Sequence, residues 1–219
     1  MVRVLNILVL GPDGRNKSII EFLKARGNDV SSTTEEVTVG SLQQANIEFM
    51  ISSGYAPILK EPVVSVYRHR IINLHISYLP YGKGIAPNFW SFFEGTPNGV
   101  TIHFINAGID SGEIICQKRV EFHPDDTLET SHTMLMKTLE TFFMDQWQSL
   151  IDNDFKPVSQ VNLVEKGTYH NRLESEGFLD LLPQRWQTPV SQVRDLGTDV
   201  ALSGNFWDMY DQSVGEANG

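Results

Sequence analysis

Cysteine is almost absent from this chain, which has one, Cys116, among 219 residues. A single cysteine excludes an intrachain disulfide, and the sequence therefore favours a reducing compartment such as the cytoplasm. Cys116 follows two isoleucines in an apolar run. We therefore expect a small buried side chain there rather than a nucleophile.

Positive charge is scarce as well. The chain has 17 Lys and Arg against 27 Asp and Glu, and its formal net charge is -10. Proteins that bind nucleic acid usually present a basic patch, so nucleic acid is not an expected partner. No apolar run approaches the roughly 18 residues of a membrane-spanning helix. The first run ends at Gly11, with Asp13 close behind, which indicates a strand rather than a signal peptide. A cytoplasmic protein without membrane contact is expected.

Several familiar catalytic patterns are missing. The chain contains no G-x-S-x-G sequence, which disfavours a serine hydrolase. It also lacks H-E-x-x-H and any cysteine cluster, and His75 and His103 are far apart in sequence, so no metal site is expected. We interpret His69, His123 and His132 as surface or core residues.

The pattern of apolar residues predicts an α/β protein with a mixed, mainly parallel sheet flanked by helices. Polar, turn-rich residues 31–44 leave little room for a further strand and helix. We expect a catalytic domain over residues 1–150 and a short C-terminal extension over 151–219 that packs on it. The predicted strands cover residues 4–10, 47–51, 71–73, 100–105 and 113–122, the last two as an antiparallel pair, and the predicted helices cover residues 18–26, 61–66 and 128–150.

Chemistry-bearing residues gather between positions 71 and 117. Asn73 and His75 are two apart at the end of an apolar run, so on an extended strand they face the same side. An Asn amide can donate to a developing oxyanion, a His can move a proton near neutral pH, and Asp110 could tune that His or accept a proton. Taken singly, each residue is more simply a satisfied core histidine or a turn-forming aspartate. Together they suit attack on a carbonyl without a covalent intermediate.

The same stretch resembles the folate-dependent formyltransferases. Their pattern Asn-x-His-x-Ser-x-Leu-Pro is matched by residues 73–80, Gly-Val-Thr-Ile-His by residues 99–103, and Asp-x-Gly-x-Ile-Ile-x-Gln by residues 110–117. The likeness extends in layout over about residues 4–150. It implies a Rossmann-like formyltransferase domain, 10-formyltetrahydrofolate as the formyl donor, and an amine as acceptor.

The resemblance also implies roles for particular residues. Asn73, His75 and Asp110 correspond to the catalytic trio of the family, and His103 becomes a strand residue that packs behind the site. No metal is implied. The residues implied in folate binding are Ser53, Gly54, Tyr55, Ala56, Ile58, Ile105 and Gly108.

Within the family, the chain most resembles sugar N-formyltransferases. This branch implies a nucleotide-linked amino-deoxysugar as acceptor, with dTDP as the expected nucleotide, and a place in polysaccharide or O-antigen biosynthesis. A homodimer is expected, partly because the aromatic helix over residues 128–150 needs cover. The residues expected to bind the acceptor are Ser77, Lys83, Trp90 and Tyr169.

Two alternatives stay open. Phosphoribosylglycinamide formyltransferases are near in length, and their phosphate loop Gly-x-Gly-x-Asn is matched in part by residues 12–16. Their proline after the catalytic histidine is Ile76 here. The chain could also be a non-catalytic module that binds folate or a nucleotide sugar, although a pure binder would not need Asn73, His75 and Asp110 together.

Overall fold

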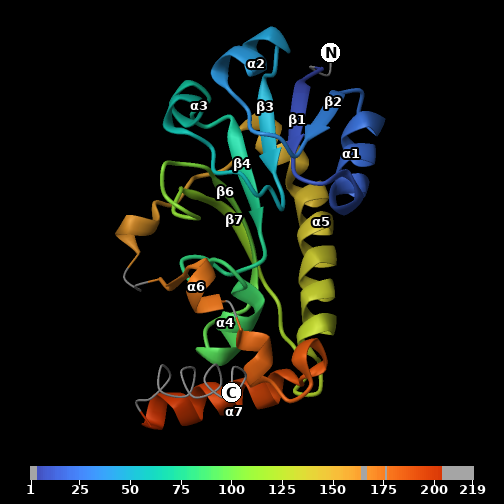
Figure 1. The fold of residues 1–219 in the computed structure, drawn as a ribbon. Helices are drawn as coiled ribbons and strands as arrows, with labels where there is room; N and C mark the ends of the chain where they lie inside the picture. Colours follow the sequence, from blue (N-terminus) through green and yellow to red (C-terminus); the bar gives the residue numbers. More distant parts are fainter. Residues whose placement is uncertain (1–3, 164–166, 176, 204–219) are drawn as a thin grey trace. The chain divides into compact units, whose positions relative to one another are not determined.

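The computed structural model describes residues 4–163, 167–175 and 177–203 (Figure 1). The chain divides into two compact units, each drawn from three stretches of sequence. The described residues of unit 1 fall within Met1–His75, Val100–Lys118 and Thr138–Val164. Those of unit 2 fall within Ile76–Gly99, Arg119–Lys137 and Glu165–Gly219. The division into a domain over residues 1–150 and an extension over 151–219 stays a prediction.

Unit 1 is built on a six-stranded sheet with the strand order β2-β1-β3-β4-β6-β7. β1 pairs in parallel with β2 and β3, and β3 pairs in parallel with β4, whereas β6 runs antiparallel to β4. This confirms the predicted mixed, mainly parallel sheet. The strands are β1 (Asn6–Leu10), β2 (Asp29–Thr33), β3 (Phe49–Ser52), β4 (Ile71–His75), β6 (Gly99–Phe104) and β7 (Ile114–Arg119).

Helices pack on both faces of this sheet, which is why its central strands are continuous apolar runs. Met50 of β3 lies in an apolar cluster with Leu42 of α2 and Val63 of α3. The neighbouring Phe49 points to the opposite face and meets Trp147 of α5, with ring centroids 6.4 Å apart. The helices are α1 (Asp13–Ala25), α2 (Val39–Gln44), α3 (Glu61–Val66) and α5 (Leu128–Asp152), and α5 contributes residues to both units.

The prediction for residues 31–44 was wrong, because β2 and α2 both lie in or border this region (Figure 1). β2 has β1 as its one neighbour in the sheet, and of its residues only Val30 is fully buried. Such a strand needs little apolar sequence. α2 is short, and it begins with a capping box between Thr38 and Ser41, where a Ser replaces the usual Glu or Gln. Neither element therefore has a strong sequence signal.

β6 and β7 form the predicted antiparallel pair. The Phe104 amide donates to the Glu113 carbonyl at 2.9 Å, and the Gln117 side chain donates to the Thr101 hydroxyl at 3.0 Å. Thr101 of β6 meets Gln117 of β7, and Phe104 meets Glu113 just before β7, so the two strands run in opposite directions. The turn between these strands carries Asp110.

Unit 2 has its own apolar core. Phe89 and Phe92 of α4 are buried against Leu128 of α5 and against Val190 and Val193 of α7. Its elements are α4 (Pro87–Phe93), α6 (Arg172–Ser175), α7 (Val190–Ser203) and a two-stranded sheet of β5 (Lys83–Gly84) and β8 (Tyr169–His170). Among the helices of the described residues, none is long and apolar enough to cross a membrane.

Candidate active site

β4 and β6 bring three polar side chains to one face of the sheet. Asn73 and His75 are two apart on β4 and so face the same side. β6 runs antiparallel beside β4 with His103 directly opposite Asn73, so the two side chains are cross-strand neighbours. His75 and His103 are both buried. The rigid sheet therefore fixes the positions of these groups.

Asp110 reaches this group from the turn between β6 and β7. Its backbone has a left-handed φ of +46°, which bends the turn back towards the sheet. Asn73 Nδ2 donates to Asp110 Oδ1 at 3.1 Å, and His75 Nδ1 lies 3.8 Å from the same oxygen. The structure thus brings together the three residues that the sequence predicted as a catalytic trio. Their catalytic roles stay predictions.

His103 belongs to the same cluster, although we expected it only to pack behind the site. It is buried, and its Nδ1 lies 2.8 Å from the Phe104 carbonyl oxygen. A carbonyl oxygen can only accept, so Nδ1 carries a proton. Its Nε2 lies 3.2 Å from Asn73 Nδ2 and 3.5 Å from Asp110 Oδ1. With the proton on Nδ1, Nε2 can accept a hydrogen bond from the Asn73 amide.

This network orients the Asn73 side chain. One amide hydrogen goes to Asp110 and the other to His103, so the nitrogen must face both partners. A reversed amide would bring its oxygen against the Asp110 carboxylate, which cannot donate when ionised. Asn73 is therefore held in one orientation before any ligand is bound.

Gln160 holds the Asp110 turn from 50 residues further along the chain. Its side-chain nitrogen donates to the carbonyls of Asp110 at 2.9 Å and Gly112 at 2.7 Å. Gly112 cannot be replaced easily, because a Cβ there would lie 1.8 Å from the Phe104 carbonyl oxygen. Sequence reasoning missed Gln160, since it lies in a short 3-10 turn, Gln160–Asn162, within a region of no clear pattern.

The residues predicted for folate binding fall into two loops of unit 1. Ser53, Gly54, Tyr55, Ala56 and Ile58 follow the end of β3, and Ile105 and Gly108 lie in the turn after β6. In the first loop, the Tyr55 hydroxyl donates to the Glu35 carbonyl at 2.6 Å, and burial raises the pKa of Tyr55. In the second, Asn106 Oδ1 accepts from the Gly108 amide and from the Ser111 hydroxyl. Both loops are thus ordered by their own hydrogen bonds.

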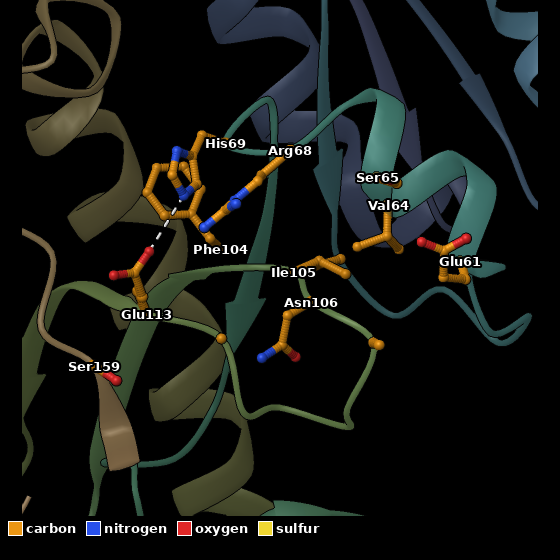
Figure 2. A pocket seen from close by; sticks show the side chains of 12 residues that line it. Glu61, Val64, Ser65, Arg68, His69, Phe104, Ile105, Asn106, Glu113 and Ser159 are labelled. Atoms are coloured by element: carbon orange, nitrogen blue, oxygen red, sulfur yellow. Dashed lines mark ion pairs between the residues drawn. The ribbon is translucent and has the colours of Figure 1, made fainter. Parts of the chain in front are cut away.

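A cavity of about 330 Å³ lies between α3 and the turn after β6 (Figure 2). Val64 and Ile105 give it apolar walls, while His69 and Glu113 form an ion pair at 3.2 Å on its lining. His69 also packs on the Phe104 ring, with centroids 4.8 Å apart. Ile105 is the residue that this cavity shares with the predicted folate-binding set, and the cavity lining includes none of Asn73, His75 and Asp110.

The residues predicted to bind the acceptor all belong to unit 2. β5 and β8 pair in parallel with Lys83 in register with Tyr169, so these two side chains are neighbours across 86 residues of sequence. The Tyr169 side chain is exposed. The Ser77 hydroxyl donates to the Tyr81 carbonyl at 2.8 Å and so stabilises the turn before β5.

Trp90, the fourth predicted acceptor residue, lies in the core of unit 2. Its ring stacks on His170 with centroids 3.7 Å apart and an interplanar angle of 6°, and its Nε1 donates to Ser175 at 3.0 Å. Only 3% of Trp90 is exposed. His170 is held in turn by Glu94 at 2.7 Å and Glu174 at 3.6 Å. In this conformation, a direct contact between Trp90 and a substrate would require the indole to move.

Cys116 is half-buried rather than fully buried as expected, but its surroundings are still those of an inert side chain. Burial raises the pKa of its thiol to about 12, so almost no thiolate forms near neutral pH. No group of three or more His, Cys, Asp and Glu side chains within the described ranges is placed to hold a metal ion.

Comparison with known proteins identifies the family. A family model described as formyl transferase matches residues 11–145. The solved structure of the formyltransferase PseJ from Anoxybacillus kamchatkensis is 38% identical, with a TM-score of 0.80, and the match covers 87% of this chain and 98% of that one. PseJ was crystallised in complex with UDP-4,6-dideoxy-4-formamido-L-AltNAc and tetrahydrofolate.

Other relatives have lower sequence identity to this chain, and some of them are longer. A methionyl-tRNA formyltransferase from Caldanaerobacter subterraneus is 26% identical over 157 residues, which cover 71% of this chain and 48% of that protein. The chain spans about half the length, or less, of the first curated relatives it matches. A phosphoribosylglycinamide formyltransferase from Bacillus halodurans shares the fold, with 23% identity, a TM-score of 0.58, and coverage of 69% of this chain and 97% of that one.

The family model covers more than half of the sequence, including β4 with Asn73 and His75 and the turn that carries Asp110. The chain therefore belongs to the formyl transferase family.

Proposed function

We propose that this protein transfers a formyl group from 10-formyltetrahydrofolate to the primary amine of a nucleotide-linked amino sugar. The observation that carries the proposal is the likeness to PseJ over nearly all of both chains. The PseJ complex contains tetrahydrofolate together with a nucleotide sugar that bears a formamido group, which are the two products such a reaction would leave.

The folate would bind in unit 1, against the two loops that follow β3 and β6. These loops carry the predicted residues Tyr55, Ile58, Ile105 and Gly108 near the carboxyl ends of strands, where open α/β sheets place their ligands. Ile105 also lines the cavity beside α3 (Figure 2). An exposed Ile58 and a half-buried Ile105 offer apolar contact to a flat ring.

The reaction begins with a neutral amine that attacks the formyl carbon. A new N–C bond forms, and the carbonyl electrons move to oxygen to give a tetrahedral oxyanion. The protonated His75 and the Asn73 amide stabilise this charge by hydrogen bonding. His75 Nδ1 faces Asp110, so the opposite nitrogen, Nε2, is the one assigned to the oxyanion.

Collapse of the intermediate breaks the bond between the formyl carbon and N10 of the folate. Asp110 accepts the proton that the amine loses and passes it on to N10, which gives tetrahydrofolate and returns the carboxylate. Both Asn73 amide hydrogens are used by Asp110 and His103 in the described structure, so donor binding must redirect one of them to the oxyanion. Hydrogen bonds at catalytic sites commonly rearrange in this way on substrate binding.

Lys83 and Tyr169 are the residues that we assign to the acceptor. Their register across the β5–β8 pair places an ammonium next to an exposed aromatic ring. A lysine suits the charge of a diphosphate, and a tyrosine ring suits stacking with a base or sugar. We predicted dTDP from the sequence, whereas the likeness to PseJ favours a UDP-linked acceptor.

The proposal is tested by offering 10-formyltetrahydrofolate with a panel of acceptors and measuring tetrahydrofolate release. The panel contains UDP-linked and dTDP-linked amino sugars, glycinamide ribonucleotide and methionyl-tRNA. We expect turnover with a nucleotide-linked amino sugar, and mass spectrometry should show a product heavier by one formyl group. Turnover with glycinamide ribonucleotide alone would contradict the sugar acceptor.

A non-catalytic module is separated from an enzyme by the same assay. A module would bind folate without releasing tetrahydrofolate, whatever acceptor is present. The polar cluster around Asp110 favours the enzyme, because a binding pocket has no need of a carboxylate that accepts from an amide and lies close to two imidazoles. The homodimer, the cytoplasmic location and the place in polysaccharide biosynthesis stay predictions.

A further inference from the structure

A second cavity lies in unit 2. It is polar and has a volume of about 220 Å³. Residues 95–98, which follow α4, line it together with residues 119–122 and with Arg194 of α7. None of the residues that line it was predicted to bind folate or the acceptor. Two arginines, Arg119 and Arg194, come to this cavity from segments that lie 75 residues apart in sequence.

Both guanidinium groups are positioned by aromatic rings. Arg119 lies over the Tyr78 ring at 4.9 Å from the centroid, and Arg194 lies over the Phe92 ring at 5.2 Å. A ring that covers one face of a guanidinium leaves its N–H edges to donate in the plane. Neither arginine forms an ion pair with a carboxylate of the described residues. Their charge is therefore not neutralised by a close partner in this part of the chain.

Thr96 supplies an independent indication of a ligand. Its hydroxyl oxygen is enclosed and has no hydrogen-bond partner within the described ranges, although its residue lines this cavity. An enclosed hydroxyl without a partner destabilises the folded protein, because it has lost its bonds to water and gained none in return. If the Thr96 side chain rotates towards the cavity, a ligand oxygen there can accept its proton and remove that cost.

The charges that line the cavity select an anion. Glu121 is the acidic residue on the described lining, and it is exposed, so the two arginines leave a net positive charge. This contrasts with the formal charge of -10 on the whole chain. Two planar guanidinium groups and a hydroxyl match the several oxygens of a phosphoryl group better than a single carboxylate.

We propose that this cavity binds the phosphoryl group of a small molecule, with Arg119 and Arg194 as its cationic ligands and Thr96 as its hydroxyl donor. The proposal goes beyond formyl transfer and does not depend on it. The phosphoryl group can come from free phosphate or from a diphosphate, and the two sources are separated by experiment.

The test is a calorimetric titration of the purified protein with inorganic phosphate, pyrophosphate and acetate at low ionic strength. We expect saturable phosphate binding that weakens as salt is added, and acetate should bind at least tenfold more weakly. Tighter binding of pyrophosphate than of phosphate indicates that the site is built for a diphosphate. Equal binding indicates that it is built for a single phosphoryl group. Either result supports the site.

Three variants probe the ligands. Arg119→Gln and Arg194→Gln should each weaken phosphate binding at least tenfold. Thr96→Val should weaken it several-fold without lowering the melting temperature of the phosphate-free protein, because the change removes an unpartnered hydroxyl. Arg26→Gln is the matched control, since Arg26 also lies over an aromatic ring, Phe22 at 3.7 Å, but lies outside the cavity.

Two outcomes would overturn the proposal. One is the absence of saturable phosphate binding to the unaltered protein. The other is phosphate affinity that remains the same in Arg119→Gln and Arg194→Gln as in Arg26→Gln. Circular dichroism of each variant establishes that the fold is kept, so a loss of binding is attributable to the side chain.

Discussion

At the scale of single residues, Asp110 is the point on which the polar contacts of the site converge. One of its oxygens, Oδ1, accepts from Asn73 at 3.1 Å and lies 3.8 Å from His75 and 3.5 Å from His103. Its side chain is 13% exposed. A carboxylate so placed can hold an imidazolium and accept a proton, which gives it a role that an amide cannot take over.

Replacing Asp110 by asparagine should therefore lower kcat by about two to four orders of magnitude, as expected when acid–base catalysis is lost. The melting temperature should change little, because the new side chain has nearly the same size and can still hydrogen-bond. Steady-state kinetics and thermal unfolding check the two halves of this expectation. Asp125→Asn is the control, since Asp125 also lies beside a histidine, His123 at 3.4 Å, but at the surface. Near-full activity of Asp110→Asn would remove this residue from the mechanism.

His103 should act by positioning Asn73. In His103→Gln the amide can still occupy the place of Nε2, whereas in His103→Asn it reaches only the place of Nδ1. We expect kcat to fall further in His103→Asn than in His103→Gln, while the KM for folate changes little in both. A role confined to core packing would predict equal loss of kcat in the two variants, or loss that follows their melting temperatures.

Local pattern predicted part of this site. The two-residue spacing of Asn73 and His75 was enough to place them on one face, and the family resemblance joined Asp110, already a candidate for its chemistry, to them. The contacts of His103 were not predictable, because they depend on the register between β4 and β6, which sets His103 opposite Asn73. Register is decided by pairing between distant segments and leaves no mark in a short stretch of sequence.

At the scale of elements, the turn between β6 and β7 depends on a residue outside it. Gln160 donates to the carbonyls of Asp110 and Gly112, so it fixes the backbone from which the predicted catalytic carboxylate extends. The turn also carries Ile105 and Gly108, which are predicted to contact folate. Its conformation should therefore affect both chemistry and donor binding.

Gln160→Met keeps the length of the side chain but removes both donated hydrogen bonds. We expect the free energy of unfolding to fall by about 1–3 kcal/mol, because two buried carbonyls lose their donor. The KM for 10-formyltetrahydrofolate should rise and kcat should fall. Gln148→Met is the control, since Gln148 is exposed and bonds only to Asp152 on its own helix. Unchanged kinetics in Gln160→Met would show that the turn keeps its shape without the hydrogen bonds from Gln160.

The β5–β8 pair depends on a glycine. Gly84 has a φ of +87°, and a Cβ there would lie 2.2 Å from the His170 carbonyl oxygen. Gly84→Ala should separate the two strands and displace Lys83 from Tyr169. If these residues bind the acceptor, its KM should rise at least tenfold while the KM for folate stays the same. Gly14→Ala is the control, because a Cβ at Gly14 meets nothing within 4 Å. An equal rise in both KM values would contradict the assignment.

Long, strongly patterned elements were predictable, and short ones were not. The apolar stripe over residues 128–150 predicted α5 to within two residues. β2 was missed because it has a single neighbour in the sheet and needs little apolar sequence, and β8 because it has only two residues and pairs with β5 far away in the chain. The elements that sequence reveals are those that bury a continuous apolar face.

At the scale of the whole molecule, the net charge bears on the choice of acceptor. The formal charge of -10 should repel a polyanion such as tRNA, and this repulsion grows as the salt concentration falls. We expect tRNA at low ionic strength to leave the rate of sugar formylation unchanged. Inhibition by tRNA that strengthens as salt is removed would instead indicate a nucleic-acid surface, and would favour an acceptor like that of the methionyl-tRNA relatives.

The interleaving of the two units along the chain has a consequence for protein synthesis. Asn73, His75, His103 and Asp110 are all translated before Gln160, which follows Asp110 by 50 residues. While the ribosome adds those residues, the nascent chain already carries every predicted catalytic group but lacks the side chain that braces the Asp110 turn. The site is thus complete as a set of residues well before it is complete as a structure, and activity should appear late in elongation.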